Sequence, residues 1–249
     1  MKNTKEKTII VVGASRGMGR EIAALAADNG KRVIAVARST QALSDLASSS
    51  SKITAEVADA SCATTAARLL TRWHPDEVVL CAGAEPVMRS IRDYDWESFA
   101  QPFEVDAKTT FHWLRNALVA PMKATGRIVV FSSGAALHGS ALSGGYAPAK
   151  QAQRYLANYV RQEASAAQLG LRIQVVLPQL NPNTRLGAAA VAGYAAKAGE
   201  TPEAFVKKRF GTPLTPSIAA SAISEMLSGV HDQYNEMMLT GKGLTPLPA

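Results

Sequence analysis

Short apolar runs of strand length alternate through much of the chain with longer segments rich in alanine and leucine. Uninterrupted apolar runs suit strands that are buried on both faces of a parallel sheet. Strands that alternate with helices therefore predict an α/β fold built on a doubly wound parallel sheet. The predicted strands are Thr8–Val12, Arg32–Ala37, Ile53–Val57, Asp76–Leu80, Arg127–Ser132 and Arg172–Leu177.

The segments between these runs are long enough for helices. Residues 17–29 carry apolar side chains at helical spacing, and Gly30 follows in the position that commonly ends a helix. The longest segments are Phe99–Lys123 and Tyr146–Gln168. Pro102 marks either a first turn or a kink in the former, because proline lacks the backbone N–H that an interior helical position uses.

Residues 187–210 have little strand character and follow a predicted strand at the carboxyl edge of the sheet. We predict a small helical lid over the site at residues 186–211, inside a single domain that spans residues 1–249. A length of 249 residues, with 47% hydrophobic and 19% charged residues, is typical of one soluble α/β domain.

The net charge of +7 raises the question of nucleic acid as a partner. No basic stretch is interleaved with aromatic residues, so we predict no nucleic-acid binding and attribute the charge to an anionic cofactor or substrate. The densest basic cluster, residues 207–209, is interpreted as a solvated helix face.

The opening of the chain is polar and basic, and the apolar run after it is only strand length. A secretory signal needs an apolar core of ~7–15 residues, and a membrane span needs ~20. We therefore expect a cytoplasmic protein that begins near Met1 and does not contact a membrane. Cys62 and Cys81 form neither a disulfide framework nor a metal-ligand spacing, so we predict no disulfide and no metal.

Three glycines lie in the seven residues that join the first predicted strand to the first predicted helix. Glycine allows a tight turn and a close approach of the backbone to a pyrophosphate. The helix N-terminus then offers free N–H groups and a partial positive charge. The turn predicts a dinucleotide site. The residues expected to contact the cofactor here are Gly13, Ser15, Arg16, Gly17, Met18 and Gly19.

The charge at the end of the second predicted strand distinguishes the two dinucleotides. An acidic residue there holds the ribose 2′-hydroxyl of NAD, whereas arginine suits the 2′-phosphate of NADP. Here Ala37 is followed by Arg38, no acid is nearby, and Arg16 lies inside the glycine turn. These residues predict NADPH.

A serine, a tyrosine and a lysine that could together exchange a proton with a substrate occur in this order along the chain. Ser133 ends a predicted strand, and Tyr146 and Lys150 are four residues apart, which places them on one helix face. A nearby lysine lowers the pKa of a phenol toward the working pH. Such a phenol can exchange a proton with a carbonyl oxygen, which a serine hydroxyl can hold in place.

With these motifs in order, the chain resembles the short-chain dehydrogenase/reductase family over nearly its whole length. The resemblance implies a Rossmann-type fold, a small-molecule carbonyl or alcohol substrate, and a homotetramer or homodimer formed through the two long helices. It also implies that Lys150 binds the nicotinamide ribose, and that the positive charge of the oxidised cofactor helps to lower the pKa of Tyr146. Further cofactor contacts implied by matching positions are Asp59, Ala60, Ala82, Gly83, Pro178 and Thr184.

The chain departs from the family pattern at four places. Asp106 stands where the family has a catalytic asparagine, Cys81 replaces the asparagine of an Asn-Ala-Gly motif, Gln179 replaces a glycine, and the Asp-Gly-Gly ending is missing. A carboxylate near the site would raise the pKa of Tyr146. Our hypothesis is that Asp106 displaces the pH optimum upward relative to Asp106→Asn. The alternative is a carboxylate on the helix surface.

Position relative to these motifs also suggests residues that face the substrate. His138 has no nucleophile to pair with, so it is interpreted as a pocket-wall or exposed residue. The expected substrate-facing residues are Glu85, Leu137, His138, Leu142, Gln179 and Tyr194.

The leading prediction is an NADPH-dependent oxidoreductase that acts on carbonyl compounds or secondary alcohols. Its catalytic residues would be Ser133, Tyr146, Lys150 and Asp106. The first alternative is an NADPH-binding sensor without turnover, which the departures at Cys81, Asp106 and Gln179 motivate. The second is dehydration or epimerisation with the same Tyr146–Lys150 pair.

Overall fold

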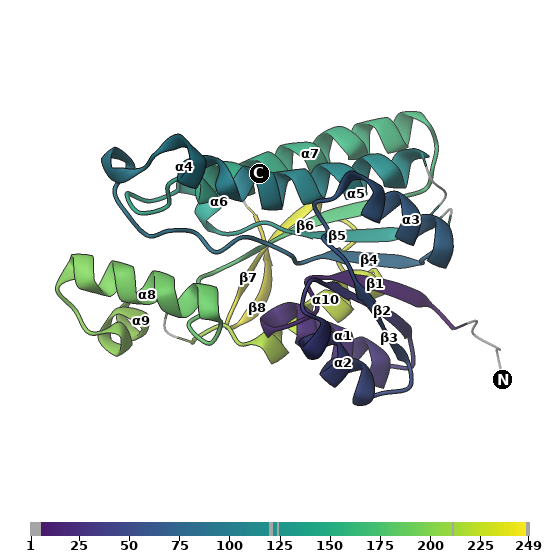
Figure 1. Cartoon of the computed structure of the whole chain (residues 1–249), viewed down its shortest axis with the longest axis horizontal. Coiled ribbons are helices and arrows are strands. Elements are labelled where there is room, and N and C mark those ends of the chain that lie inside the picture. The colour runs from purple at the N-terminus through teal and green to yellow at the C-terminus, as the bar shows by residue number, and fades with distance from the viewer. Residues whose placement is uncertain (1–5, 120–121, 124, 211, 248–249) are drawn as a thin grey trace.

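The computed structural model describes residues 6–119, 122–123, 125–210 and 212–247. Met1 and residue 211, the last residue of the predicted lid, lie outside the described residues. The described chain forms one sheet of eight strands in the order β3-β2-β1-β4-β5-β6-β7-β8 (Figure 1). The strands are β1 (Thr8–Val12), β2 (Arg32–Ala37), β3 (Ile53–Val57), β4 (Glu77–Leu80), β5 (Arg127–Phe131), β6 (Arg172–Pro178), β7 (Glu236–Thr240) and β8 (Gly243–Pro246).

The sheet is parallel from β3 to β7, and only β8 pairs antiparallel with its neighbour. The strand order reverses between β1 and β4, and ligands of such sheets bind at the carboxyl ends of the strands beside this switch point. The predicted doubly wound parallel fold is therefore confirmed.

Helices cover both faces of this sheet (Figure 1). The helices are α1 (Gly17–Asp28), α2 (Thr40–Ser48), α3 (Ala63–Trp73), α4 (Trp96–Pro102), α5 (Lys108–Val119), α6 (Ala135–His138), α7 (Tyr146–Ala166), α8 (Arg185–Ala198), α9 (Pro202–Phe210) and α10 (Pro216–Ser228). The described chain also contains a short 3₁₀ segment, η1 (Ile91–Asp93), before α4 and a π-helix, η2 (Phe103–Ala107), between α4 and α5.

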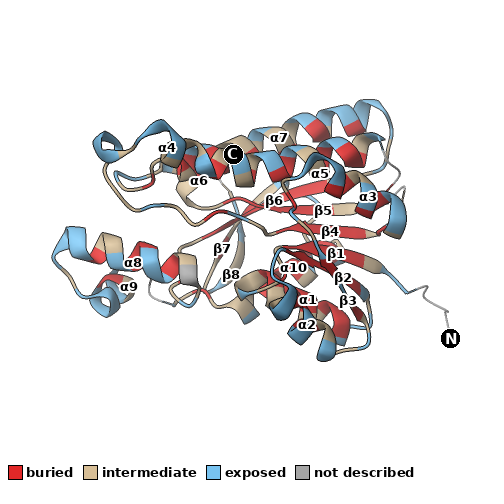
Figure 2. Cartoon of the chain, in the orientation of Figure 1, coloured by how far each residue is buried: buried red, intermediate tan, exposed pale blue. Residues whose placement is uncertain are grey.

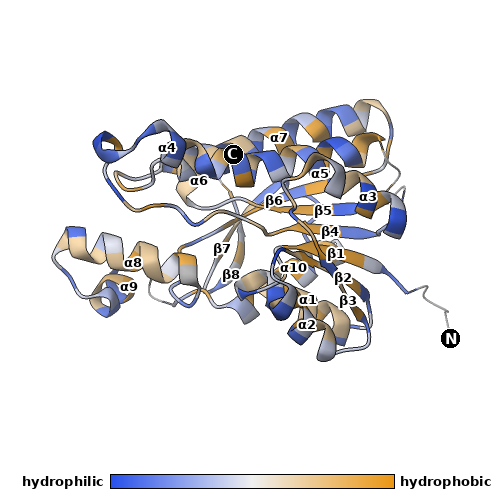
Figure 3. Cartoon of the chain, viewed as in Figure 1, coloured by the Kyte–Doolittle hydropathy of each residue, from blue (hydrophilic) through white to orange (hydrophobic). Residues whose placement is uncertain are grey.

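Two apolar layers hold the helices on the sheet. Because successive side chains of a strand point to opposite faces, Ile9 and Val11 join the layer that contains α1 and α10. Ile10 and Val12 join the layer that contains α3, α5 and α7. Figure 2 shows the central strands β1, β2, β4, β5 and β6 almost wholly buried, and Figure 3 shows hydrophobic residues along much of these strands.

The predicted helix at residues 99–123 is interrupted. It begins earlier, as α4, passes through the π-helix η2 and continues as α5 to Val119. Pro102 lies in the last turn of α4 and not in a first turn, so of the two predicted alternatives the kink describes it better. Proline cannot supply an interior helical N–H, and a π-helix is one way in which a helix absorbs such a break.

The two edges of the sheet are built differently. Glu56 in edge strand β3 is only 8% exposed, and its carboxylate pairs with Arg68 and Arg72 of α3 at 3.2 and 2.9 Å. The other edge strand, β8, is short and ends at Pro246. Neither β7 nor β8 was predicted from the sequence, because these short segments lack an uninterrupted apolar run.

Candidate functional site

A cleft of about 1030 Å³ opens at the carboxyl edge of the sheet, a volume at the upper end of the range for ligand pockets. It extends from the glycine turn after β1 to the helices α8 and α9. Every residue predicted to contact the cofactor lines this cleft. These residues are Gly13, Ser15, Arg16, Gly17, Met18, Gly19, Arg38, Asp59, Ala60, Ala82, Gly83, Tyr146, Lys150, Pro178 and Thr184.

The glycine turn has no room for side chains. Gly13 has a φ of +91°, and a Cβ atom there would come within 2.6 Å of the Ala82 backbone nitrogen. A Cβ atom on Gly19 would collide with the carbonyl oxygen of Gly13. The turn therefore brings bare backbone against the start of α1, whose first N–H groups face the cleft. This cradle fits the pyrophosphate of a dinucleotide.

Two arginines lie in the segments that follow β1 and β2. Arg16 and Arg38 are both exposed and line the cleft. The guanidinium of Arg16 pairs with the carboxylate of Glu85 at 2.7 Å. Asp59 accepts hydrogen bonds from the backbone N–H and hydroxyl of Ser61, which together with Arg38 lower its pKa. The Arg16–Glu85 pair was not predicted from the sequence.

Three of the four residues predicted to be catalytic, Ser133, Tyr146 and Lys150, line the cleft. Tyr146 and Lys150 begin α7, and Ser133 follows β5. The Lys150 ammonium lies 5.6 Å from the centroid of the Tyr146 ring and 3.2 Å from the Phe131 carbonyl oxygen. A cation, a phenol and a hydroxyl in this arrangement can hold an oxygen and exchange a proton with it.

The charge state of Tyr146 is a balance of opposing effects. The surrounding protein excludes water from its hydroxyl and raises its pKa, while Lys150 and a hydrogen bond from the Ser133 hydroxyl lower it. Asp106 and Tyr194 raise it further, so the pKa ends above its ordinary value. Lys150 lowers the pKa of Tyr146 as predicted, but burial in the protein without a bound ligand raises that pKa by more.

Asp106 lies directly behind the lysine. Its carboxylate is 0% exposed, with one oxygen 3.1 Å from the Lys150 Nζ and the other accepting the Ala84 N–H at 2.6 Å. Gln153 donates to its backbone carbonyl at 3.3 Å. Burial is the largest single effect on Lys150 and opposes its charge, but Asp106, Tyr146 and Cys81 together raise the pKa of Lys150. The alternative of a surface carboxylate is therefore wrong.

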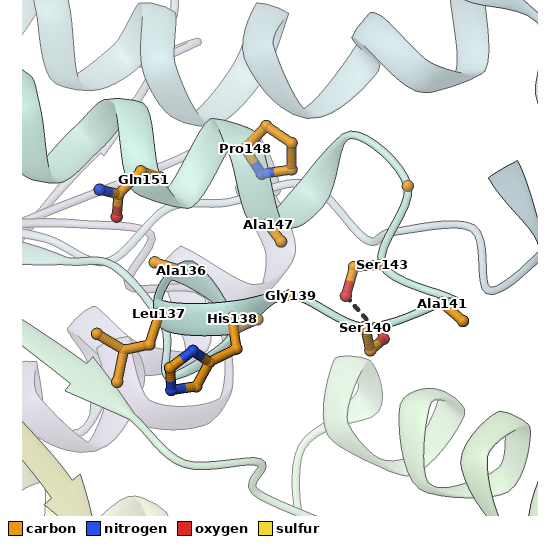
Figure 4. Close-up of a pocket in the computed structure, with 12 residues that line it drawn as sticks. Ala136, Leu137, His138, Gly139, Ser140, Ala141, Ser143, Ala147, Pro148 and Gln151 are labelled. Carbon is orange, nitrogen blue, oxygen red and sulfur yellow. Dashed lines mark hydrogen bonds between the residues drawn. The ribbon is translucent and has the colours of Figure 1, made fainter.

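The residues predicted to face the substrate divide into three groups. Glu85, Gln179 and Tyr194 line the cleft. Leu137 and His138 line a neighbouring hollow instead, and Figure 4 shows them pointing away from α7. Leu142 is half-buried outside the lining of both hollows. The short helix α6 directs Leu137 and His138 toward the neighbouring hollow. This direction could not be predicted from their sequence distance to Ser133.

Several cleft residues were not predicted. Ser140 and Ser143 join by a hydrogen bond of 2.9 Å, visible in Figure 4, and the Tyr194 hydroxyl also bonds Ser140. Phe205 and Arg209 reach the same cleft from α9. The only sequence signal for Arg209 was the basic cluster at residues 207–209.

Among the described residues, both cysteines are free, and no group of three or more histidine, cysteine, aspartate or glutamate side chains could hold a metal. Burial raises the pKa of the Cys81 thiol to about 12. No helix in the described part of the chain has the length and apolar character to span a membrane.

Known proteins share this architecture. The crystal structure of levodione reductase superimposes on this chain with a TM-score of 0.81 at 17% sequence identity, covering 94% of this chain and 96% of that one. An NADPH-bound variant of actinorhodin polyketide ketoreductase gives a TM-score of 0.82 at 20% identity, covering 97% and 98%. A short-chain dehydrogenase from Streptomyces avermitilis gives 0.76 at 25% identity, covering 96% and 90%.

A comparison with curated protein sequences finds no significant match. The sequence model of the family described as short chain dehydrogenase matches residues 7–192, about three quarters of the chain. The chain thus belongs to the short-chain dehydrogenases, oxidoreductases that use a nicotinamide cofactor on small-molecule substrates.

Proposed function

We propose that the protein is an NADPH-dependent oxidoreductase that interconverts a carbonyl compound and a secondary alcohol. The observation that carries the proposal is that Ser133, Tyr146 and Lys150 line the same cleft as the glycine turn. A dinucleotide laid along that cleft has its phosphates at one end and the proton donor at the other.

The preference for NADPH is supported by charge. Arg16 and Arg38 line the cleft, and β2 ends in Ala37 without an acid to hold a ribose 2′-hydroxyl. The Arg16–Glu85 pair is exposed, with side chains 59% and 34% accessible, so a phosphate dianion can compete for the guanidinium. Arginine binds phosphate oxygens through a planar fork of N–H donors.

The protein's part in the chemistry is to hold an oxygen and move a proton. Ser133 orients the substrate oxygen, and Tyr146 donates its proton to that oxygen in reduction or removes it in oxidation. Lys150 stabilises the phenolate form and would bind the nicotinamide ribose. When bound, the nicotinamide supplies or accepts the hydride. Asp106 keeps Lys150 charged and positioned in a buried environment, where an unpaired ammonium would be costly.

The test follows the absorbance of NADPH and NADH with a panel of ketones, quinones and aldehydes. Tyr146→Phe should lower kcat at least 100-fold, because general acid–base catalysis contributes about 10²–10⁴. Tyr234→Phe is the matched control, since Tyr234 lies outside the lining of the cleft. Tyr146→Phe that turns over like the wild type would refute the proposal.

A sensor that binds NADPH without turnover is the second candidate. The raised pKa of Tyr146 and the buried Asp106 beside Lys150 favour it, because both oppose formation of the phenolate. Tight binding of NADPH with no turnover on the whole panel would support the sensor.

We further propose a homo-oligomer formed through α5 and α7. The support is a set of exposed apolar or aromatic side chains on these helices, and such patches mark contact surfaces. Light scattering at several concentrations tests this proposal. The cytoplasmic location stays a prediction. The exposed side chains are Phe111, Val119, Tyr155 and Tyr159.

A further inference from the structure

The basic cluster at the end of α9 separates into residues with different surroundings. Lys208 pairs with Glu200, with 2.6 Å between the ammonium and the carboxylate oxygen, while Lys207 is exposed. Arg209 lines the cleft. All three side chains are exposed, as expected for a solvated helix face, and Arg209 in addition lines the cleft.

The exposed Arg209 side chain lies over an aromatic stack. Its guanidinium carbon lies 5.1 Å from the centroid of the Phe205 ring, and Phe205 is only 5% exposed. Phe205 in turn stacks on Tyr194, with 6.0 Å between centroids and 10° between ring planes. The Tyr194 hydroxyl bonds Ser140 on the other wall of the cleft. A guanidinium that lies on an aromatic face keeps its N–H donors available at the edge.

The carboxylates of Asp59 and Glu85, which line the cleft, interact with residues other than Arg209. Asp59 is bonded to Ser61, and Glu85 is paired with Arg16. Within the described residues, no carboxylate lies within ion-pair distance of Arg209. Figure 1 shows α8 and α9 beyond the carboxyl edge of the sheet, well away from α2 and the residues that follow β2. Positive charge in a cleft attracts anionic ligands.

We infer that Arg209 is the receptor for a carboxylate on the substrate, so the preferred substrates are keto acids whose acid group lies away from the reacting carbonyl. The inference rests on the proposed function, because it places the reacting carbonyl at Ser133 and Tyr146. The planar carboxylate accepts two parallel hydrogen bonds from the guanidinium edge. Tyr194 and Phe205 form the apolar wall between the two ends of the substrate.

The experiment measures binding without turnover. Calorimetry on protein saturated with NADP⁺, which cannot reduce a ketone, compares keto acids of increasing chain length, beginning with levulinate, with their methyl esters. At least one acid should bind about tenfold more tightly than its ester, the difference typical of a hydrogen-bonded charge. Arg209→Gln should remove that preference, and Lys207→Gln should keep it.

The outcomes separate this inference from the proposed function. Acids that bind no better than esters, or a preference that survives in Arg209→Gln, overturn the carboxylate site. If the esters are nevertheless reduced with NADPH, the proposed reaction stands. Acids that bind through Arg209 with no reduction of any substrate would support the site and refute the reaction. Equal thermal midpoints for both variants and the wild type exclude a folding defect.

Discussion

The two walls of the cleft differ in how firmly they are built. The nucleotide wall is the edge of a sheet whose strands are buried on both faces, beneath two large apolar layers. The wall made by α8 and α9 has a small core of its own, in which Val191, Ala195 and Phe205 are the buried members. A region with little buried apolar surface opens at a lower free-energy cost than the rest of the fold. We therefore expect the wall at the sheet edge to be more rigid than the wall made by α8 and α9.

The largest expected effect comes from two glycines with the same backbone requirement. Gly13 and Gly199 both have positive φ, which costs an alanine about 1–2 kcal/mol. Only at Gly13 would the new Cβ also meet backbone, whereas at Gly199 nothing lies within 4 Å. Gly13→Ala should abolish NADPH binding and lower the unfolding free energy well beyond Gly199→Ala, as calorimetry and urea unfolding would measure. Equal losses of NADPH affinity and unfolding free energy in both variants would show that the two walls do not differ in how closely their backbones are packed.

The next effect concerns charge on the nucleotide wall. The double variant Arg16→Ala/Arg38→Ala should weaken NADPH binding on the order of 100-fold, because two phosphate contacts are lost, while NADH binding stays within about twofold. Fluorescence titration of each cofactor measures both values. Arg32→Ala is the control, since Arg32 lies at the opposite end of β2 and stacks on Trp73. A parallel loss for both cofactors would contradict the proposed role in selection.

A third test compares the two cores directly. Leu69 of α3 is 0% exposed, so Leu69→Ala should lower the unfolding free energy of the whole fold by about 2–5 kcal/mol. Phe205→Ala should instead speed amide hydrogen exchange at residues 185–210 and raise KM, with a smaller change in global stability. Hydrogen-exchange mass spectrometry with urea unfolding measures both. A global loss for Phe205→Ala as large as for Leu69→Ala would mean that the lid is part of the main cooperative unit.

The smallest expected effect is a shift of a pH profile. In the oxidation direction Tyr146 acts as phenolate, so the rate rises with pH through its pKa. Asp106 raises that pKa, and Asp106→Asn should therefore move the rising limb to lower pH. Glu104→Gln, in the same π-helix but with a side chain 67% exposed and paired with Lys108, should leave the limb in place. Superimposable wild-type and Asp106→Asn profiles would show that the buried charge of Asp106 does not change the pKa of Tyr146.

The nucleotide wall could be predicted from the sequence because its elements are specified locally. An apolar run, a glycine turn and an amphipathic helix follow one another within a few residues, and strands β1 to β3 have the predicted bounds. The same holds for Tyr146 and Lys150, whose spacing on one helix fixes their common direction.

The rest of the site depends on packing between distant segments. The burial of Asp106 is set by the π-helix and by Lys150 across the helix pair, so its residue type alone could not exclude a surface position. Arg209 faces the cleft because Phe205 packs on Tyr194, a contact between two helices. Leu137 and His138 line the neighbouring hollow because of the direction of the short helix α6, and this direction has no sequence signature.

The edges of the sheet bear on how copies of the chain can associate. Exposed edge strands are templates for strand addition and fibre growth, and proteins resist this with inward charges, short strands and proline. Glu56, held by two arginines inside β3, and Pro246, at the end of the short antiparallel β8, place such features at both edges. Both edges of the sheet therefore disfavour open-ended growth by strand addition.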